Sequence, residues 1–169
     1  MSVQEHKQKA KQHVRCKVVT ISDTRTKETD KSGALMISLL EEHGYEVTSY
    51  EIVKDDQASI QEAIVSGCDR SDVDVVLTNG GTGITKRDVT IEAVKELIDK
   101  EIVGFGELFR MLSYTEDIGS AAILSRAIAG TIGNKAVFST PGSSGAVRLA
   151  MTKLILPELR HVVWELNRQ

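Results

Sequence analysis

A glycine-rich segment contains the residues best suited to chemistry, Thr78-Asn-Gly-Gly-Thr-Gly-Ile-Thr-Lys-Arg-Asp88. Three of the four residues from Gly80 to Gly83 are glycines, so the backbone can turn sharply and bring its N–H groups close to an anion. The N-terminus of a following helix would add partial positive charge. The segment lacks the Gly-Lys-Ser/Thr of a Walker A loop, and Lys86 replaces the third glycine of the dinucleotide-binding fingerprint. We therefore predict a phosphate-binding loop; the alternative is a glycine-rich turn without a ligand.

Asp88 ends this segment, and its carboxylate would repel a bound phosphate. Two unit charges about 4 Å apart repel by about 4 kcal/mol at an effective dielectric of about 20. A bound cation reverses the sign, and Mg²⁺ favours one or two carboxylates together with substrate phosphates. The alternative role for Asp88 is to cap a helix that begins near Thr90, which is worth about 1 kcal/mol.

Polar loops follow three other predicted strands. Ser22-Asp-Thr24 follows the first, Lys54-Asp-Asp56 the second, and Ser139-Thr-Pro-Gly-Ser-Ser-Gly145 the last. Ligands of open α/β sheets bind beyond the carboxyl ends of the strands, so these loops could converge on the glycine loop. Taken alone, Asp55-Asp56 is more typical of a solvated helix start than of a catalytic pair. The last loop, which includes Ser143, is a second candidate anion site, and two such loops favour a ligand with more than one anionic group.

The elements that must position these loops alternate along the chain. Strands are predicted at Lys17–Ile21, Glu46–Val53 and Val73–Thr78, and the first and third of these are expected to be buried in the sheet. Helices are predicted from about Asp30 to His43, around Ile60 to Gly67, and over Thr90–Lys100, from apolar residues at helical spacing. This alternation predicts an α/β fold with a mainly parallel sheet that helices cover on both faces.

The last third of the chain departs from this pattern. Arg126–Ile132 and Lys135–Thr140 flank Gly133-Asn134, a two-residue hairpin signal, so one strand is predicted to be antiparallel. A long helix is predicted from about Ser144, with a kink at Pro157. In the segment before the hairpin, four apolar residues could form either a core face or a subunit contact, and we favour part of the segment being intersubunit: Phe105, Leu108, Met111 and Leu112.

Composition narrows the class of protein. The 169 residues predict one domain over 14–169, preceded by a polar arm over 1–13. A net charge of -3 argues against general nucleic-acid binding. Two cysteines, Cys16 and Cys68, do not have the spacing of a zinc site. The arm has no apolar signal-peptide core, and no run approaches the length needed to span a membrane, so we expect a cytoplasmic protein.

Several motifs in order resemble the molybdenum cofactor biosynthesis family: Thr78-Asn-Gly-Gly-Thr-Gly83, Arg87-Asp-Val-Thr90, Gly104-Phe-Gly-Glu107, Ala122-Ile-Leu-Ser-Arg126 and Pro141-Gly142. The resemblance covers nearly everything from Val14 to Asn167. It implies a three-layer α/β/α sandwich that binds molybdopterin, a pterin with a dithiolene and a phosphate. Adenylyltransferase members of the family join that phosphate to AMP from Mg-ATP and release pyrophosphate. The resemblance also implies a homotrimer or a hexamer, and other cofactor-biosynthesis proteins as possible partners.

The resemblance also implies roles for individual residues. Asp55 and Asp88 match the family's acids and would be catalytic and hold Mg²⁺. Substrate-binding residues would be Gly80, Gly81, Thr82, Gly83, Glu107, Pro141, Gly142 and Ser143. The sequence departs from the family pattern at Asn79, where many relatives have Thr, and at Ser143-Ser-Gly145, where adenylyltransferases have a pattern nearer Gln/Asn-Pro-x. The second departure bears on adenylylation more than on pterin binding, so a non-catalytic molybdopterin-binding or scaffolding protein is the alternative.

Overall fold

The fold is built on a mixed β-sheet. The computed structural model describes residues 2–9 and 13–168 of the chain. Within them one sheet of six strands has the order β2-β1-β3-β6-β5-β4. The strands are β1 (Arg15–Ile21), β2 (Glu46–Val53), β3 (Val75–Asn79), β4 (Lys100–Glu101), β5 (Ile128–Ile132) and β6 (Lys135–Thr140). Strands β2, β1, β3 and β6 are parallel, whereas β5 is antiparallel to both of its neighbours. The predicted sheet with one antiparallel strand is confirmed.

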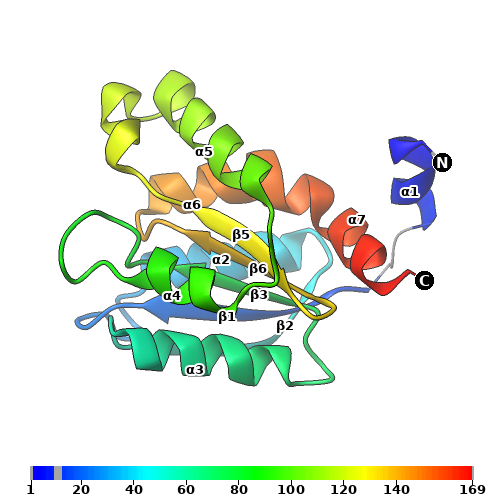
Figure 1. The fold of residues 1–169 in the computed structure, drawn as a ribbon, viewed down its shortest axis with the longest axis horizontal. Helices are drawn as coiled ribbons and strands as arrows, with labels where there is room; N and C mark the ends of the chain where they lie inside the picture. The colour runs from blue at the N-terminus through cyan, green and yellow to red at the C-terminus, as the bar shows by residue number, and fades with distance from the viewer. Residues whose placement is uncertain (1, 10–12, 169) are drawn as a thin grey trace.

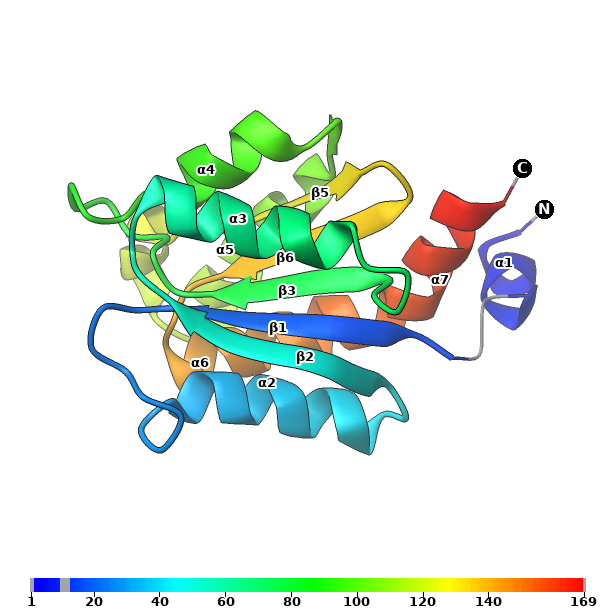
Figure 2. The ribbon, with the colours of Figure 1, turned by 90° about the horizontal axis from the view of Figure 1, so that it is seen from below.

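Helices cover both faces of this sheet, as predicted (Figures 1 and 2). Helices α3 and α4 pack on one face; α2, α5, α6 and α7 pack on the other. Their bounds are α2 (Lys31–Glu42), α3 (Gln57–Cys68), α4 (Thr90–Leu97), α5 (Val103–Glu116), α6 (Ser144–Ala150) and α7 (Leu156–Asn167). None of the helices in the described ranges is long and apolar enough to cross a membrane.

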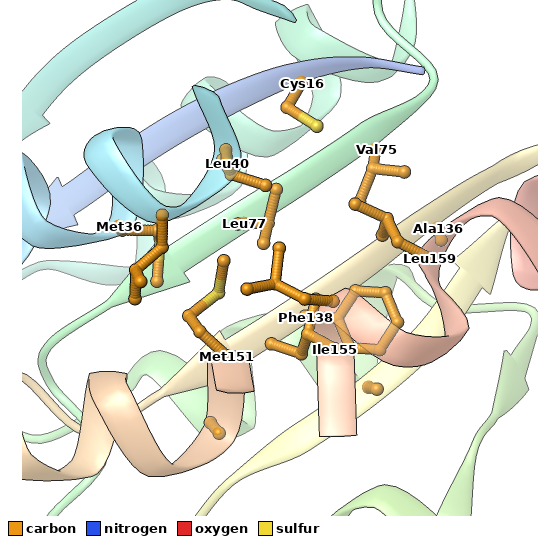
Figure 3. Packing of buried hydrophobic residues seen from close by; sticks show 14 of the residues in the cluster. Cys16, Met36, Leu40, Val75, Leu77, Ala136, Phe138, Met151, Ile155 and Leu159 are labelled. Carbon is orange, nitrogen blue, oxygen red and sulfur yellow. The ribbon is translucent and has the colours of Figure 1, made fainter. Parts of the chain in front are cut away.

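Alternating side chains of the central strands fill two apolar layers. Leu77 and Phe138 point toward the α2, α6 and α7 side, where they meet Met36 and Met151 (Figure 3). Val76 and Val137, one residue earlier on each strand, pack instead against α3 and α4. Apolar residues at successive positions are required because a parallel sheet in a three-layer fold is buried on both faces. The sheet is therefore a rigid platform for the loops at its edge.

Two predicted helices differ from the observed ones. The helix that begins at Thr90 ends at Leu97 rather than Lys100, because the amide of Asp99 donates to the carbonyl of Thr131 at 2.7 Å and the chain joins β5 as strand β4. The last helix is irregular before Pro157 rather than at it: a π-helical turn, η2 (Met151–Ile155), separates α6 from α7. Proline cannot donate to the carbonyl four residues earlier and its ring crowds that carbonyl, so a wider turn accommodates it.

The remaining segments lie at the periphery. The polar arm expected over residues 1–13 includes helix α1 (Val3–Lys9), while residues 1 and 10–12 lie outside the described ranges. In α5, Phe105 is buried and packs edge-on against Phe138, with ring centroids 5.3 Å apart. Leu108 and Met111 on the same helix are about half exposed. Phe105 is therefore a core residue, and the other two lie on the outer surface.

Candidate functional site

A cavity of about 680 Å³ lies at the edge of the sheet where the parallel strands end. The loops after β1, β2, β3 and β6 contribute to its wall, as predicted from the order of strands and helices. A 3₁₀ turn, η1 (Gly119–Leu124), contributes a further wall with apolar side chains. The lining residues are Ile21–Arg25, Asp55, Gly80–Gly83, Arg87, Asp88, Ile118, Ala121, Leu124, Ser125, Pro141 and Gly142.

The glycine loop adopts a left-handed backbone that favours glycine. Gly80 and Gly81 have φ of +105° and +69°. A Cβ on Gly80 would lie 2.2 Å from the carbonyl oxygen of Ile21. The loop therefore packs against the end of β1, and a side chain at this position would force the two apart.

The carbonyl groups of the loop are held by other protein groups. The Oγ1 of Thr90 donates to the carbonyl of Gly80 at 2.9 Å, and the amide of Thr90 donates to the carbonyl of Gly81 at 3.0 Å. Arg126 donates to the carbonyls of Thr82 and Gly83 through Nε, at 3.0 and 3.1 Å. The amides of Gly81, Thr82 and Gly83 donate to no protein acceptor in the described part of the chain. These three residues line the cavity, so their amides are available to an anionic ligand there, as a phosphate site requires.

Two carboxylates lie beside this loop. Asp55 Oδ1 is buried and has no hydrogen-bond partner among the described residues, and a Cβ on Gly81 would lie 2.9 Å from it. Burial raises the pKa of Asp55, and the negative charges of Asp88 and then Asp56 raise it further. Leaving a buried acceptor without a partner is costly, so this oxygen is suited to a bound cation or donor.

Asp88 does not cap helix α4. Val89 is the residue that precedes the helix, and it makes no side-chain cap. The Oδ2 of Asp88 instead accepts from the amide and Oγ1 of Thr85, at 2.9 and 2.6 Å. The alternative role considered for Asp88 from the sequence is therefore wrong, because the carboxylate folds back over its own loop. It lines the cavity together with Asp55.

Two carboxylates facing phosphate donors fit Mg²⁺, which takes a few protein oxygens and completes its shell with water and substrate. Within residues 2–9 and 13–168 there is no group of three or more His, Cys, Asp or Glu side chains that could hold a metal alone. Asp55 Oδ1 and the Asp88 carboxylate are the oxygens best suited to take part, since the two oxygens of Asp23 are engaged by Arg87 and the amide of Asp55. The arrangement suits a metal that arrives with phosphate better than one the protein holds permanently.

The loop that follows β6, the second candidate anion site, is held in place by side chains from the loop after β1 and from α2. Arg25 Nη2 and Ser32 Oγ both donate to the carbonyl of Gly142, at 2.9 and 2.5 Å. Arg25 also donates to the side chain of Asn79 at 3.4 Å, and it lines the cavity. Arg25 was not among the predicted site residues, because it is far in sequence from Gly142 and belongs to no recognisable motif with it.

Arg87 and Asp23 connect the glycine loop to the loop after β1. Their side chains form an ion pair, and the other oxygen of Asp23 accepts from the amide of Asp55 at 3.0 Å. Both residues line the cavity, so one edge of it carries two acids and an arginine in addition to Asp88.

The structure separates two of the predicted site residues from the cavity. Glu107 is exposed on α5 and is not part of the lining. Ser143 caps α6, accepting from the amide of Ala146 at 3.2 Å, and it also lies outside the lining. The other predicted residues, Asp55, Asp88, Gly80, Gly81, Thr82, Gly83, Pro141 and Gly142, line one cavity together.

The fold and the site define an α/β protein with a candidate ligand cavity at the carboxyl edge of its sheet. Comparisons with known proteins agree with this class. The family model described as "Probable molybdopterin binding domain" matches residues 17–161. Molybdenum cofactor biosynthesis protein B of Bacillus cereus is 75% identical over 169 residues, which is 100% of both chains.

Solved structures are similar in fold as well. A crystal structure of molybdenum cofactor biosynthesis protein B has a TM-score of 0.92 and 75% identity, covering 94% of this chain and 98% of that one. The tungsten cofactor synthesizing protein MoaB from Pyrococcus furiosus has a TM-score of 0.84 and 40% identity, covering 94% and 100%. The chain belongs to the molybdopterin-binding family of molybdenum cofactor biosynthesis proteins, within its B-protein branch.

Proposed function

We propose that this chain binds molybdopterin and uses Mg-ATP to adenylylate the phosphate of the pterin. The observation that carries the proposal is the junction of Asp55 and Asp88 with the free amides of Gly81, Thr82 and Gly83 in one cavity. Donors for phosphate and acceptors for a cation are both needed when two phosphate groups must be brought together.

The reaction requires positioning more than a protein nucleophile. An oxygen of the pterin phosphate forms a bond to the α-phosphorus of ATP; the bond from that phosphorus to the bridging β-phosphate oxygen breaks, and pyrophosphate leaves. When bound, Mg²⁺ would offset the negative charge of the phosphates. Asp55 and Asp88 would hold it, while the loop amides and Arg25 donate to phosphate oxygens.

The apolar wall of η1 serves the non-ionic parts of the ligands. Ile118, which immediately precedes η1, and Ala121 and Leu124 within it line the same cavity as the phosphate donors. Flat heteroaromatic rings bury apolar area against such side chains, while a few polar groups fix their orientation. The cavity thus offers separate surfaces for rings and for phosphates.

A non-catalytic molybdopterin-binding or scaffolding role is the second candidate. It is favoured by the second loop, in which Ser143 caps α6 and lies outside the cavity lining. That leaves Pro141 and Gly142 as the residues of this loop that line the cavity. In this case molybdopterin would bind without transfer of AMP.

One incubation separates the two candidates. The protein is mixed with molybdopterin and Mg-ATP, and adenylylated molybdopterin and pyrophosphate are quantified by chromatography and mass spectrometry. We expect both products in equal amounts, and none with a variant carrying Asp55→Asn and Asp88→Asn. Binding of molybdopterin without either product would support the scaffolding role instead.

We also propose a cellular location and an oligomeric state for the protein. A cytoplasmic location would give access to ATP and to other cofactor-biosynthesis proteins that make or receive the pterin. A homotrimer or hexamer remains part of the proposal, on the basis of the family resemblance and the exposed apolar residues of α5.

A further inference from the structure

We infer that Arg126 is a positioning residue that holds the loop from Gly80 to Asp88 in its anion-binding form. The inference rests on the proposed function, because it concerns the same phosphate-binding loop. Arg126 lies between η1 and β5 and is not among the residues that line the cavity. It therefore acts on the ligand through the loop rather than by contact.

One guanidinium joins both ends of the loop. Its Nε donates to the carbonyls of Thr82 and Gly83, and its Nη2 donates to the carbonyl of Gly83 at 2.7 Å. The same Nη2 reaches the carbonyl of Asp88 at 3.3 Å. Thr82 and Gly83 in the first half of the loop and Asp88 at its end are thus held by the same rigid guanidinium group.

Holding a carbonyl also aims the next amide. A trans peptide is planar, so its N–H points opposite to its C=O, and the described chain contains no cis peptide. Thr90 holds the carbonyls of Gly80 and Gly81 and thereby orients the amides of Gly81 and Thr82. Arg126 holds the carbonyl of Thr82 and thereby orients the amide of Gly83. Thr90 holds the carbonyls of Gly80 and Gly81, and Arg126 holds those of Thr82 and Gly83. Without Arg126, the second pair of carbonyls would lose the contacts that hold it.

Glu92 fixes the guanidinium in turn. Arg126 Nη1 and Nη2 lie 2.5 and 3.3 Å from the two carboxylate oxygens of Glu92, in the first turn of α4. The hydrogen bond from Arg126 lowers the pKa of Glu92, so the carboxylate is charged at neutral pH. This contact fixes the plane of the guanidinium group relative to α4, the helix that follows the loop.

Lysine cannot substitute for arginine here. An ammonium is a compact charge on a flexible stem, whereas the guanidinium presents five N–H donors in a fixed plane. Contacts to three carbonyls and a carboxylate need that plane. Arg126→Lys would keep the charge near Glu92 and lose the fixed geometry of the loop.

The test compares ligand affinity with stability. Molybdopterin and Mg-ATP are each titrated calorimetrically into the wild type, Arg126→Lys, Arg126→Ala and a control, Arg70→Lys. Arg70 makes a two-pronged contact to Asp72, at 2.7 and 2.6 Å, on the surface away from the cavity. We expect Arg126→Lys to raise the Kd of both ligands by about tenfold or more, because loss of one well-aimed hydrogen bond to a charged phosphate changes a binding constant by about that factor. The control should bind as the wild type does.

Chemical rescue separates positioning from a general loss of folding. Guanidinium at millimolar concentration should restore part of the affinity of Arg126→Ala and none of that of Gly81→Ala. If Arg126→Ala does not fold, Glu92→Gln, which frees the guanidinium plane, should raise the Kd to a smaller extent than Arg126→Lys. Unchanged affinity in Arg126→Lys, or the same loss in Arg70→Lys, overturns the inference and leaves the proposed function intact. Failure of the wild type to bind either ligand overturns the proposed function itself.

Discussion

Gly142 lies so close to Gly80 that a Cβ on Gly142 would be 3.2 Å from the Cα of Gly80. The amide of Gly80 also donates to the carbonyl of Thr140 at 3.0 Å, which joins the two loops where they leave β3 and β6. The two loops inferred from the sequence to bind anions therefore form one continuous surface, which a ligand in the cavity could contact as a whole.

Replacement of Gly81 by alanine should weaken ligand binding. Its Cβ would lie 2.3 Å from Thr90 Oγ1 and 2.9 Å from Asp55 Oδ1, at a φ of +69°. Gly133→Ala is the matched control, with a φ of +59° and no atom within 4 Å. Both variants carry the left-handed strain of about 1–2 kcal/mol, but only Gly81→Ala displaces loop atoms. Calorimetry should give an increase of about tenfold or more in the Kd of Mg-ATP for Gly81→Ala alone, the factor expected for losing one hydrogen bond to a charged phosphate. Equal affinities would contradict a phosphate-binding role.

Asp88→Asn should reduce turnover far more than stability. The amide oxygen of asparagine can still accept from Thr85, while the charge proposed to hold Mg²⁺ is lost. Loss of such an electrostatic contact costs about 10²–10³ in rate. Asp56→Asn is the control, because Asp56 caps α3 at Ser59 and asparagine caps about as well. Adenylyl transfer by Asp88→Asn at the wild-type rate in saturating Mg²⁺ would remove this residue from the mechanism.

Asp55 should lower the stability of the ligand-free protein as the pH rises. Its pKa is raised above 3.8 in the fold, so over the interval between the unfolded and folded pKa values the native state binds more protons. The free energy of unfolding therefore falls as the pH rises through that interval. Melting curves without metal should show the melting temperature of the wild type falling relative to that of Asp55→Asn as the pH rises above the ordinary pKa of an aspartate. A difference in melting temperature that stays constant with pH would contradict the burial of this charge.

The same variant tests the cation. At pH 7, Mg²⁺ added with pyrophosphate should raise the melting temperature of the wild type more than that of Asp55→Asn, since binding to the native state stabilises it. Equal increases would show that the metal is held without Asp55. Pyrophosphate alone is the control for binding by the loop amides.

Light scattering should give a mass three or six times 18.5 kDa at micromolar concentration. The reason is an apolar surface on α5 and η1, where the exposed residues include Leu108, Met111, Tyr114 and Ile123. Met111→Glu should dissociate the assembly, because a charge would be buried in the contact. Val65→Glu on α3, away from this surface, is the control. A mass of 18.5 kDa for the wild type would show that each site needs one chain only.

Local signals in the sequence predicted much of the fold. Glu46–Val53 is observed with the predicted bounds. The hairpin at Gly133-Asn134 is confirmed, with only Gly133 at positive φ, as in a type II′ turn. The end of α4 could not be predicted, because it depends on pairing with Thr131, more than thirty residues later. The spacing of apolar residues along a helix does not indicate whether the residues at its end will pair with a distant strand instead.

Some residues of the candidate site could likewise be predicted from the sequence, and others could not. Asp55 and the glycine loop could be placed together, because parallel strands bring their carboxyl ends to one edge. Arg25 and Arg126 could not, because they donate to main-chain carbonyls, and any residue type can supply a carbonyl. The residue types in the two loops therefore do not indicate that an arginine binds their carbonyl groups.

The position of β6 affects how the protein forms during synthesis. Strand β6 lies in the interior of the sheet, between β3 and β5, although it is the last strand in the described chain. Until Thr140 has left the ribosome, β3 has an unpaired edge and Asn79 has no neighbour on that side. At about 5–20 residues per second, that edge stays open for several seconds after β3 is made. Nascent chains halted before residue 135 should therefore be prone to aggregation and unable to bind molybdopterin, whereas release of the hairpin would complete the sheet and the ligand site in one step.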